Sequence, residues 1–148
     1  MNCIELISDI IKIEAYADKD VHFSIPFTHD RVVRSSAVTL SGTPLLLSLK
    51  EGTAEARCSM ETSESGDRFD NSLTWQVDDN RPDTLQQIGI LSSGRYHYMI
   101  TTYGGIRKFI YNWCGAGRTL PDSSMSGNTE TTSMKFSVTG RHPILTLI

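Results

Sequence analysis

The chain has 148 residues, of which 39% are hydrophobic and 21% are charged, and its formal net charge is -3 at pH 7. A chain of this length buries about two thirds of its unfolded surface and is too apolar to stay disordered, so we predict one globular domain. The slightly acidic charge excludes a broad basic surface for nucleic acid, and only Arg95, Arg107 and Lys108 form a loose basic cluster.

The cysteines and the N-terminal residues exclude further classes of protein. Cys3, Cys58 and Cys114 are odd in number and far apart, which argues against a disulfide framework and against a zinc knuckle. The N-terminus carries Glu5 and Asp9 in place of a cationic segment, so we expect no signal peptide. No stretch approaches the roughly 20 apolar residues of a transmembrane helix. We therefore expect a soluble protein without a membrane partner.

The first 36 residues fit more than one pattern. Residues 3 to 17 carry isoleucines at helical spacing, although their second half also alternates as a strand does, and we favour a helix through about Ile13. Residues 21 to 25 alternate as a short strand that Pro26 ends. Residues 27 to 36, FTHDRVVRSS, combine charge and serine without a period, which predicts a loop or an arm.

The middle of the chain alternates apolar and polar residues in several runs. Residues 45 to 49 and 54 to 60 predict the two strands of a hairpin, with small alanines on the inner side of the second strand. Residues 63 to 71 predict a polar turn, and residues 73 to 77 predict the next half-buried strand. Residues 82 to 93 predict a short helix, because proline and aspartate suit its first turn and a glycine follows it.

Residues 94 to 113, GRYHYMITTYGGIRKFIYNW, predict a β-hairpin around a two-residue loop, because two adjacent glycines supply the positive φ angles of a tight turn. The resulting register places a row of large side chains on one core face: Ile100 opposite Phe109, Tyr98 opposite Tyr111, and Tyr96 opposite Trp113. The other face is half polar and is predicted to be a surface or an interface; it carries Arg95, His97, Met99, Thr101, Lys108 and Ile110.

The last third of the chain combines a polar stretch with two strands. Residues 115 to 133, GAGRTLPDSSMSGNTETTS, predict a long polar loop. Residues 134 to 138 alternate as a strand, and residues 144 to 148 form an apolar strand that must be buried in the domain or against a neighbour. Strand–helix–strand alternation does not recur, so residues 1–148 are predicted to be a single mainly β domain, an antiparallel β-sandwich or barrel with one or two flanking helices.

No catalytic or metal-binding motif stands out in the sequence. Cys114 could act with a histidine as a nucleophile, but no family signature surrounds it, and we favour a packing role at the end of a strand. The four histidines share no zinc-ligand spacing. Residues 66 to 71 and 78 to 80 could bring oxygen ligands for calcium to one end of the sheet, although acidic turns are common. We assign no catalytic residue, no metal and no cofactor.

The last twenty residues, TETTSMKFSVTGRHPILTLI, complete a layout that resembles small virion proteins of tailed phages. An antiparallel β-domain with a flanking helix, a long polar loop and an apolar terminal strand is similar to the tail-tube, tail-terminator and neck subunits of these particles. The resemblance covers the architecture of most of the chain and includes no specific motif. It implies a non-enzymatic virion subunit, made in the host cytoplasm, that forms a ring or tube with copies of itself and with other virion proteins.

In such a ring, DNA would pass through the channel with only non-specific contact, and a mildly acidic charge would keep it from adhering. Residues 27 to 36 and 115 to 133 would be arms between subunits, and sheet edges would pair or pack between subunits. The predicted subunit-interface residues are Arg31, Arg34, Met99, Ile110, Leu120, Met125, Ile144 and Leu147. The alternative is a stand-alone β-sandwich that binds carbohydrate or calcium.

Overall fold

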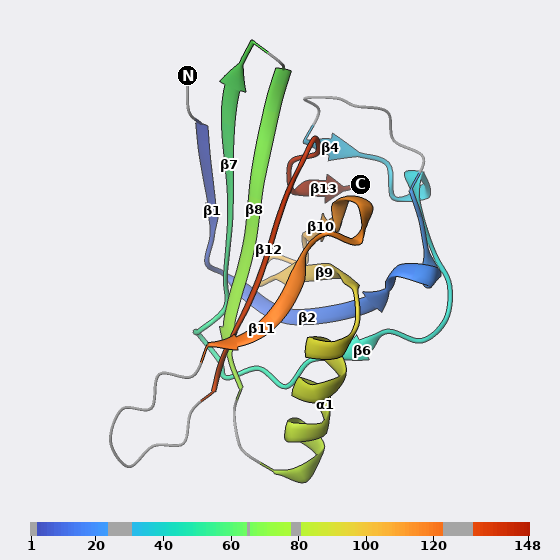
Figure 1. Ribbon diagram of the computed structural model, residues 1–148, viewed down its shortest axis with the longest axis vertical. Helices are drawn as coiled ribbons and strands as arrows, with labels where there is room; N and C mark the ends of the chain where they lie inside the picture. Colours follow the sequence, from blue (N-terminus) through green and yellow to red (C-terminus); the bar gives the residue numbers. More distant parts are fainter. Residues whose placement is uncertain (1–2, 24–30, 65, 78–80, 123–131) are drawn as a thin grey trace.

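The computed structural model describes residues 3–23, 31–64, 66–77, 81–122 and 132–148, which form two large sheets, a small ribbon and one α-helix (Figure 1). The five-stranded sheet has the order β1 (Cys3–Ile7), β7 (Glu55–Ser63), β8 (Gly66–Gln76), β12 (Ser133–Gly140) and β11 (Arg118–Asp122). The six-stranded sheet has the order β4 (Val32–Val33), β13 (Leu145–Leu147), β10 (Arg107–Ile110), β9 (Tyr96–Thr102), β2 (Ile10–Ala17) and β6 (Leu45–Leu46). The ribbon consists of β3 (Val21–Phe23) and β5 (Val38–Leu40).

The strands of the two large sheets run in different directions. In Figure 1, β7 and β8 follow the long axis of the molecule, whereas β2 and β9 run across it. The strand pairs are antiparallel except for β13 with β4, which is parallel. The predicted fold class, a mainly β antiparallel sandwich with a flanking helix, is confirmed.

The main core lies between the two large sheets, because each sheet turns an apolar row toward the other. Burial alternates along β8 and β12, as predicted for strands with one solvent-facing side. The five-stranded sheet contributes, among others, Ala56, Cys58, Leu73, Trp75, Met134 and Phe136. The six-stranded sheet contributes Ile13, Ala15, Tyr98, Ile100 and Ile110.

The six-stranded sheet is also covered on its other face. Met99, Phe109 and Leu147 point away from the five-stranded sheet and pack with Val38 of the ribbon. Because β9 is covered on both faces, most of its residues are buried and its sequence does not alternate. This second layer is the reason that the hairpin sequence contains more large apolar residues than one core face needs.

Residues 3 to 17 form two strands, so the helix predicted through Ile13 is wrong. β1 pairs with β7, and β2 crosses to the six-stranded sheet, where it lies between β9 and β6. Ile13 and Ala15 are buried as alternate residues of a strand, whereas Ile11 is exposed at a register shift in β2. β-Branched isoleucines fit a strand, and neighbours on both sides satisfy the backbone of β2.

The hairpin of β9 and β10 forms, but its loop is one residue longer than predicted. The loop comprises residues 103 to 105, and the Thr102 N–H donates to the Ile106 carbonyl oxygen at 2.9 Å. Gly105 has a positive φ of 80°, whereas Gly104 does not have a positive φ. A three-residue loop that ends on a left-handed glycine is a common hairpin connection.

The longer loop changes which side chains share a face. Tyr98 lies opposite Ile110 and faces the main core, whereas Met99 lies opposite Phe109 on the other face of the sheet. A shift of one residue moves a strand's apolar set to the other face, so the predicted aromatic row is wrong for β10. His97 is only 1% exposed and therefore does not lie on a solvent face.

β7 and β8 form a long hairpin that replaces the polar turn predicted at residues 63 to 71. Pairing runs from Glu55 opposite Thr74 to Ser63 opposite Gly66, and Phe69 is buried. Polar residues at every second position face solvent on the outer side of the sheet, which is why this strand resembles a turn in the sequence. The predicted hairpin of residues 45 to 49 with β7 is also wrong, because β6 pairs with β2.

The α-helix α1 (Pro82–Ser93) confirms the helix predicted from the sequence. Proline occupies its first turn, where a missing N–H costs nothing, and Gly94 follows its end. Leu91 is buried in the main core, Ile88 packs against that core, and the helix contacts β11. α1 therefore covers one end of the sandwich (Figure 1).

The two predicted arms contain regular structure where the structure describes them. In residues 31 to 36, β4 pairs with β13 and the 3-10 turn η2 (Ser35–Ala37) begins; residues 24–30 lie outside the described residues. In the predicted loop from 115 to 133, β11 pairs with β12, and residues 123–131 lie outside the described residues. The remaining 3-10 turns are η1 (Asp18–Asp20) and η3 (Trp113–Gly115).

Candidate subunit interface

Each of the four edge strands of the two large sheets carries an exposed apolar side chain. In the five-stranded sheet these are Leu6 on β1, 54% exposed, and Leu120 on β11, 50% exposed. In the six-stranded sheet they are Val32 on β4, 53% exposed, and Leu46 on β6, 59% exposed. An exposed apolar side chain at a sheet edge marks a place where another chain can make contact.

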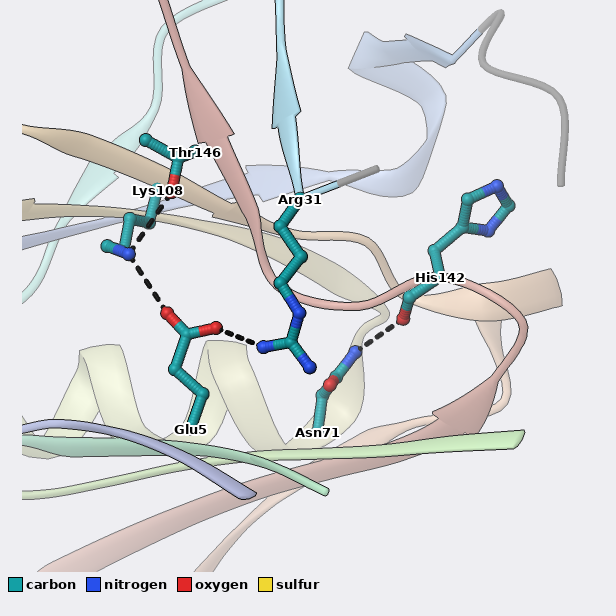
Figure 2. Close-up of polar contacts among 6 residues, drawn as sticks. All are labelled: Glu5, Arg31, Asn71, Lys108, His142 and Thr146. Carbon is teal, nitrogen blue, oxygen red and sulfur yellow. Dashed lines mark hydrogen bonds and ion pairs between the residues drawn. The ribbon is translucent and has the colours of Figure 1, made fainter. Parts of the chain in front are cut away.

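At the β1 edge, the inward-facing carboxylate of Glu5 is neutralised by two cations (Figure 2). Glu5 lies opposite the buried Cys58 of β7, so its side chain enters the space between the sheets. Arg31 Nη1 donates to Glu5 Oε2 at 2.5 Å, and Lys108 Nζ donates to Glu5 Oε1 at 3.0 Å. All three side chains are partly shielded from water, where such charge-assisted bonds are stronger than at an exposed site.

This ion cluster joins strands of both sheets. Lys108 comes from β10 and also donates to Thr146 Oγ1 of β13 at 3.1 Å, while Glu5 comes from the opposite sheet. Lys108 shares the inward face of β10 with Ile110, so neither residue lies on the outward surface that the predicted register gave them. The sequence separates the three charged residues widely, and only the strand order brings them together.

A second polar link lies close to this cluster in Figure 2. The Asn71 side-chain Nδ2 donates to the backbone oxygen of His142 at 2.9 Å, and both residues are buried. The His142 ring lies 5.7 Å from the Tyr111 ring and 5.3 Å from the Trp113 ring, measured between centroids. Buried polar groups need such bonds, so this link fixes the chain beyond β12 against β8.

His97 and Asp18 form a hydrogen-bonded pair whose geometry does not suit catalysis. The His97 Nδ1 accepts from the backbone N–H of Asn112 at 2.8 Å, and its Nε2 lies 2.6 Å from Asp18 Oδ1. Because an amide N–H can only donate, the proton is on Nε2 and is donated to the carboxylate. Burial lowers the pKa of His97, and the hydrogen bond to Asp18 partly opposes this shift. With both nitrogens engaged, the imidazole cannot accept a proton from a nucleophile.

Cys114, the nucleophile considered from the sequence, is exposed in η3 with a left-handed φ of 52°. The buried His97 cannot serve as its base, because both ring nitrogens already have partners. Among the described residues, no group of three or more His, Cys, Asp or Glu side chains is placed to hold a metal ion. The structure therefore gives no support to a catalytic cysteine or to a metal centre in the part of the chain that it describes.

The acidic turns considered for calcium are not arranged as a pair. Asp67 and Asp70 lie on opposite faces of β8, because their positions differ by an odd number, and Asp70 accepts from Thr139 Oγ1 at 2.7 Å. The other acidic segment, residues 78 to 80, lies outside the described residues. Within residues 66 to 71, the two carboxylates therefore do not converge on a position where calcium could bind.

A hollow of about 330 Å³ lies beside the end of β12 and is lined by Asp67, Arg68, Trp113 and Arg141, among others. An indole ring next to charged groups is the arrangement that the carbohydrate alternative would need. Gly140 packs so closely on Trp113 that a Cβ added there would lie 2.7 Å from the Trp113 Cβ. The charged lining carries both signs, and nothing in the hollow selects a ligand.

Half of the predicted interface residues fill the protomer core, namely Met99, Ile110, Ile144 and Leu147. β13 lies between β10 and β4, and Ile144 to Leu147 of the C-terminal strand pack within their own chain, whereas Ile148 is 73% exposed. Arg31 bonds to Glu5 in the ion cluster. Arg34 and Leu120 are exposed and stay predicted contacts, while Met125 lies outside the described residues.

Local sequence patterns do not reveal the exposed apolar residues of the other three edges, Leu6, Val32 and Leu46. Leu6 and Leu46 occupy apolar runs that could belong to a core strand, whereas Val32 lies in the charged segment predicted as a loop or an arm. Only the strand order shows that all three lie at edges. The exposure of these side chains therefore depends on the order of the strands in the sheets, which a local sequence pattern does not contain.

Comparison with protein-family models, with curated proteins and with solved structures gives no match for this chain. None of the described helices combines the length and the apolar character that crossing a membrane requires. The function of the chain therefore has to be inferred from the geometry of the molecule.

Proposed function

We propose that the chain is a non-enzymatic structural subunit that assembles with copies of itself into a ring or tube, as in the tail or neck of a phage-like particle through which DNA passes. The observation that carries the proposal is the presence of an exposed apolar side chain on all four sheet edges: Leu6, Val32, Leu46 and Leu120. Proteins that remain monomeric shield their edges from other chains, often with charged side chains. Apolar edges are expected where each edge meets a neighbour.

The polar groups of the described residues support a structural role. Glu5, Asn71 and His97 are directed inward or buried, and each bonds to a group of its own chain. Such bonds stabilise one arrangement of the two sheets. The proposed partners are copies of the chain and other virion proteins.

The charge of the chain supports a channel wall that DNA passes without adhering. The formal net charge is -3, which disfavours non-specific binding of a polyanion. The outer face of the five-stranded sheet presents exposed polar side chains such as Glu55, Arg57 and Lys135, which suit a surface that stays in contact with water. DNA would then be a passenger with only non-specific contacts.

The proposal is tested by the mass and shape of the purified chain and of two variants with equal added charge. Light scattering and negative-stain microscopy are expected to show rings or tubes for the natural sequence. An edge variant combines L6K, V32K, L46K and L120K and is expected to be monomeric, because lysine at a sheet edge opposes pairing. The control variant combines L85K, I90K, Y103K and I106K, which add the same charge at exposed positions of α1 and of the connection between β9 and β10, outside the four edge strands.

Two results would contradict this proposal. One is a natural sequence that stays monomeric at every concentration tested, together with a melting shift on adding calcium or a sugar, which favours the binding-module alternative. The other is equal loss of assembly in both charge variants, which would show that assembly does not depend on the sheet edges in particular. Circular dichroism must show that both variants keep their strands.

A further inference from the structure

We infer that β1 is the edge at which two copies of this chain join, through antiparallel pairing of β1 with β1 of a second copy about a two-fold axis. The inference rests on the proposed function and deepens it, because it separates the one edge that can form backbone hydrogen bonds from edges that can offer only side-chain contacts. The four edges of the two large sheets differ in length, in proline content and in what covers them.

Three of the four edges are poorly suited to add a strand. β4 and β6 contain two residues each, which is too short for a regular ladder. β11 is longer, but it includes Pro121, which has no N–H to donate, and it contacts α1. Short strands, prolines and a covering helix are the devices that keep sheet edges from pairing.

β1 lacks these devices. It has five residues, CIELI, without proline, lysine or a register shift, and it pairs with β7 on one side. No described element lies on its other side, where Figure 1 shows it as the outermost strand of the five-stranded sheet. Leu6 projects from this strand and is 54% exposed.

Glu5 would ordinarily protect this edge, because an inward-pointing charge opposes burial beneath an added strand. Here its carboxylate already accepts bonds from Arg31 and Lys108 (Figure 2). Covering β1 therefore leaves no unpaired charge, and the penalty for burying an ion without a partner does not arise. The ion cluster makes an otherwise guarded edge able to accept a strand.

The second strand must itself be open, and of the four edge strands of the two large sheets β1 is the one that has five residues and no proline. Pairing of this strand with the same strand of a second copy gives a two-fold contact. A register centred on Glu5 would oppose two carboxylates, whereas a register centred on Leu6 brings the two exposed leucines together. We assign the second register. Any assembly that uses this contact in every copy contains an even number of copies.

The first test compares the single variants L6K and L85K in the full chain by sedimentation velocity. The two leucines are 54% and 52% exposed, so neither substitution should prevent folding, and both add one charge. L6K is expected to lower the assembled mass at least two-fold, and L85K is expected to leave it unchanged. Equal masses for L6K and the natural sequence would overturn the inference.

The second test is a cross-link that does not depend on losing assembly. L6C in a C3S and C114S background is expected to form a covalent dimer on mild oxidation, because the two sulfurs lie opposite each other across the axis. L85C in the same background is the control and should stay monomeric on a non-reducing gel. Equal cross-linking of the two variants would overturn the assigned contact.

The outcomes also separate this inference from the proposed function. Rings or tubes that persist unchanged in L6K would overturn the inference while leaving the proposed function standing. A natural sequence that is monomeric at all concentrations would overturn both. Loss of assembly in L6K, with L6C dimers and unchanged L85K assembly, would support both.

Discussion

His97 illustrates how a single residue that resembles a catalytic group acts in stabilising the fold. Its ring is stacked on Phe109 at 6.0 Å with an interplanar angle of 6°, and it lies 5.0 Å from the Tyr111 ring. Asp18 and the Asn112 backbone hold its two nitrogens. The site accommodates the neutral imidazole, because a second proton on Nδ1 would face an N–H that also donates.

Stability should therefore depend on pH through His97. Its pKa is lowered in the folded state, chiefly by burial, from the ordinary value of 6.5, so the unfolded chain binds the proton more readily. The contribution of His97 to stability is fully present above about pH 6.5 and is lost as the pH falls below it.

We expect H97Q to lower the free energy of unfolding near pH 7 by about 1–3 kcal/mol and to flatten the decline of this free energy toward about pH 5. Urea titrations at each pH measure both effects. H22Q, at an exposed position, should keep the natural slope.

The hairpin loop of β9 and β10 allows a test at the scale of one element. Gly105 has a φ of 80°, which costs an alanine roughly 1–2 kcal/mol, whereas Gly104 does not have a positive φ. An added Cβ meets nothing within 4 Å at either glycine, so the conformation alone distinguishes them. We expect G105A to lower the free energy of unfolding by about 1 kcal/mol or more and G104A to change it by less than about 0.5 kcal/mol. Equal effects in urea titrations would show that the loop does not have this geometry.

The same elements show how far local patterns predict this fold. The strands with one solvent-facing side, such as β12 and the second half of β8, and the proline-led helix α1 can be predicted from alternation and end signals. The register of β9 and β10 cannot be predicted in this way, because Gly104 and Gly105 fit both a two-residue loop and a three-residue loop. The isoleucines of β2 also fit helical spacing, and its core pattern depends on neighbours far away in sequence.

The candidate interface is harder to predict than the fold, because it is a property of the whole molecule. Whether an apolar residue lies in the core or at an edge depends on strand order, and so Ile144 is buried while Leu6 is exposed. The covering of the six-stranded sheet by β3 and β5 likewise removes Met99 from the surface. Only the polar and apolar content of each strand can be predicted locally, and its position in the sheet cannot.

The whole molecule should unfold as one unit, since one apolar cluster joins both large sheets and includes Leu91 of α1. Leu73 of the five-stranded sheet and Ile100 of the six-stranded sheet are fully buried in it. We expect L73A and I100A each to lower the free energy of unfolding by about 2–5 kcal/mol while keeping a single transition. I106A, at a position that is 50% exposed, should change it by less than about 0.5 kcal/mol.

Two probes measure this cooperativity at one fixed protein concentration, because assembly would make the midpoint depend on concentration. In a W113F background the fluorescence of the buried Trp75 reports on the five-stranded sheet, while far-ultraviolet circular dichroism reports on all strands. The two signals should change at the same urea concentration in each variant. A circular-dichroism transition of I100A that precedes the Trp75 transition would mean that the six-stranded sheet unfolds separately. The shared core would then not couple the two sheets.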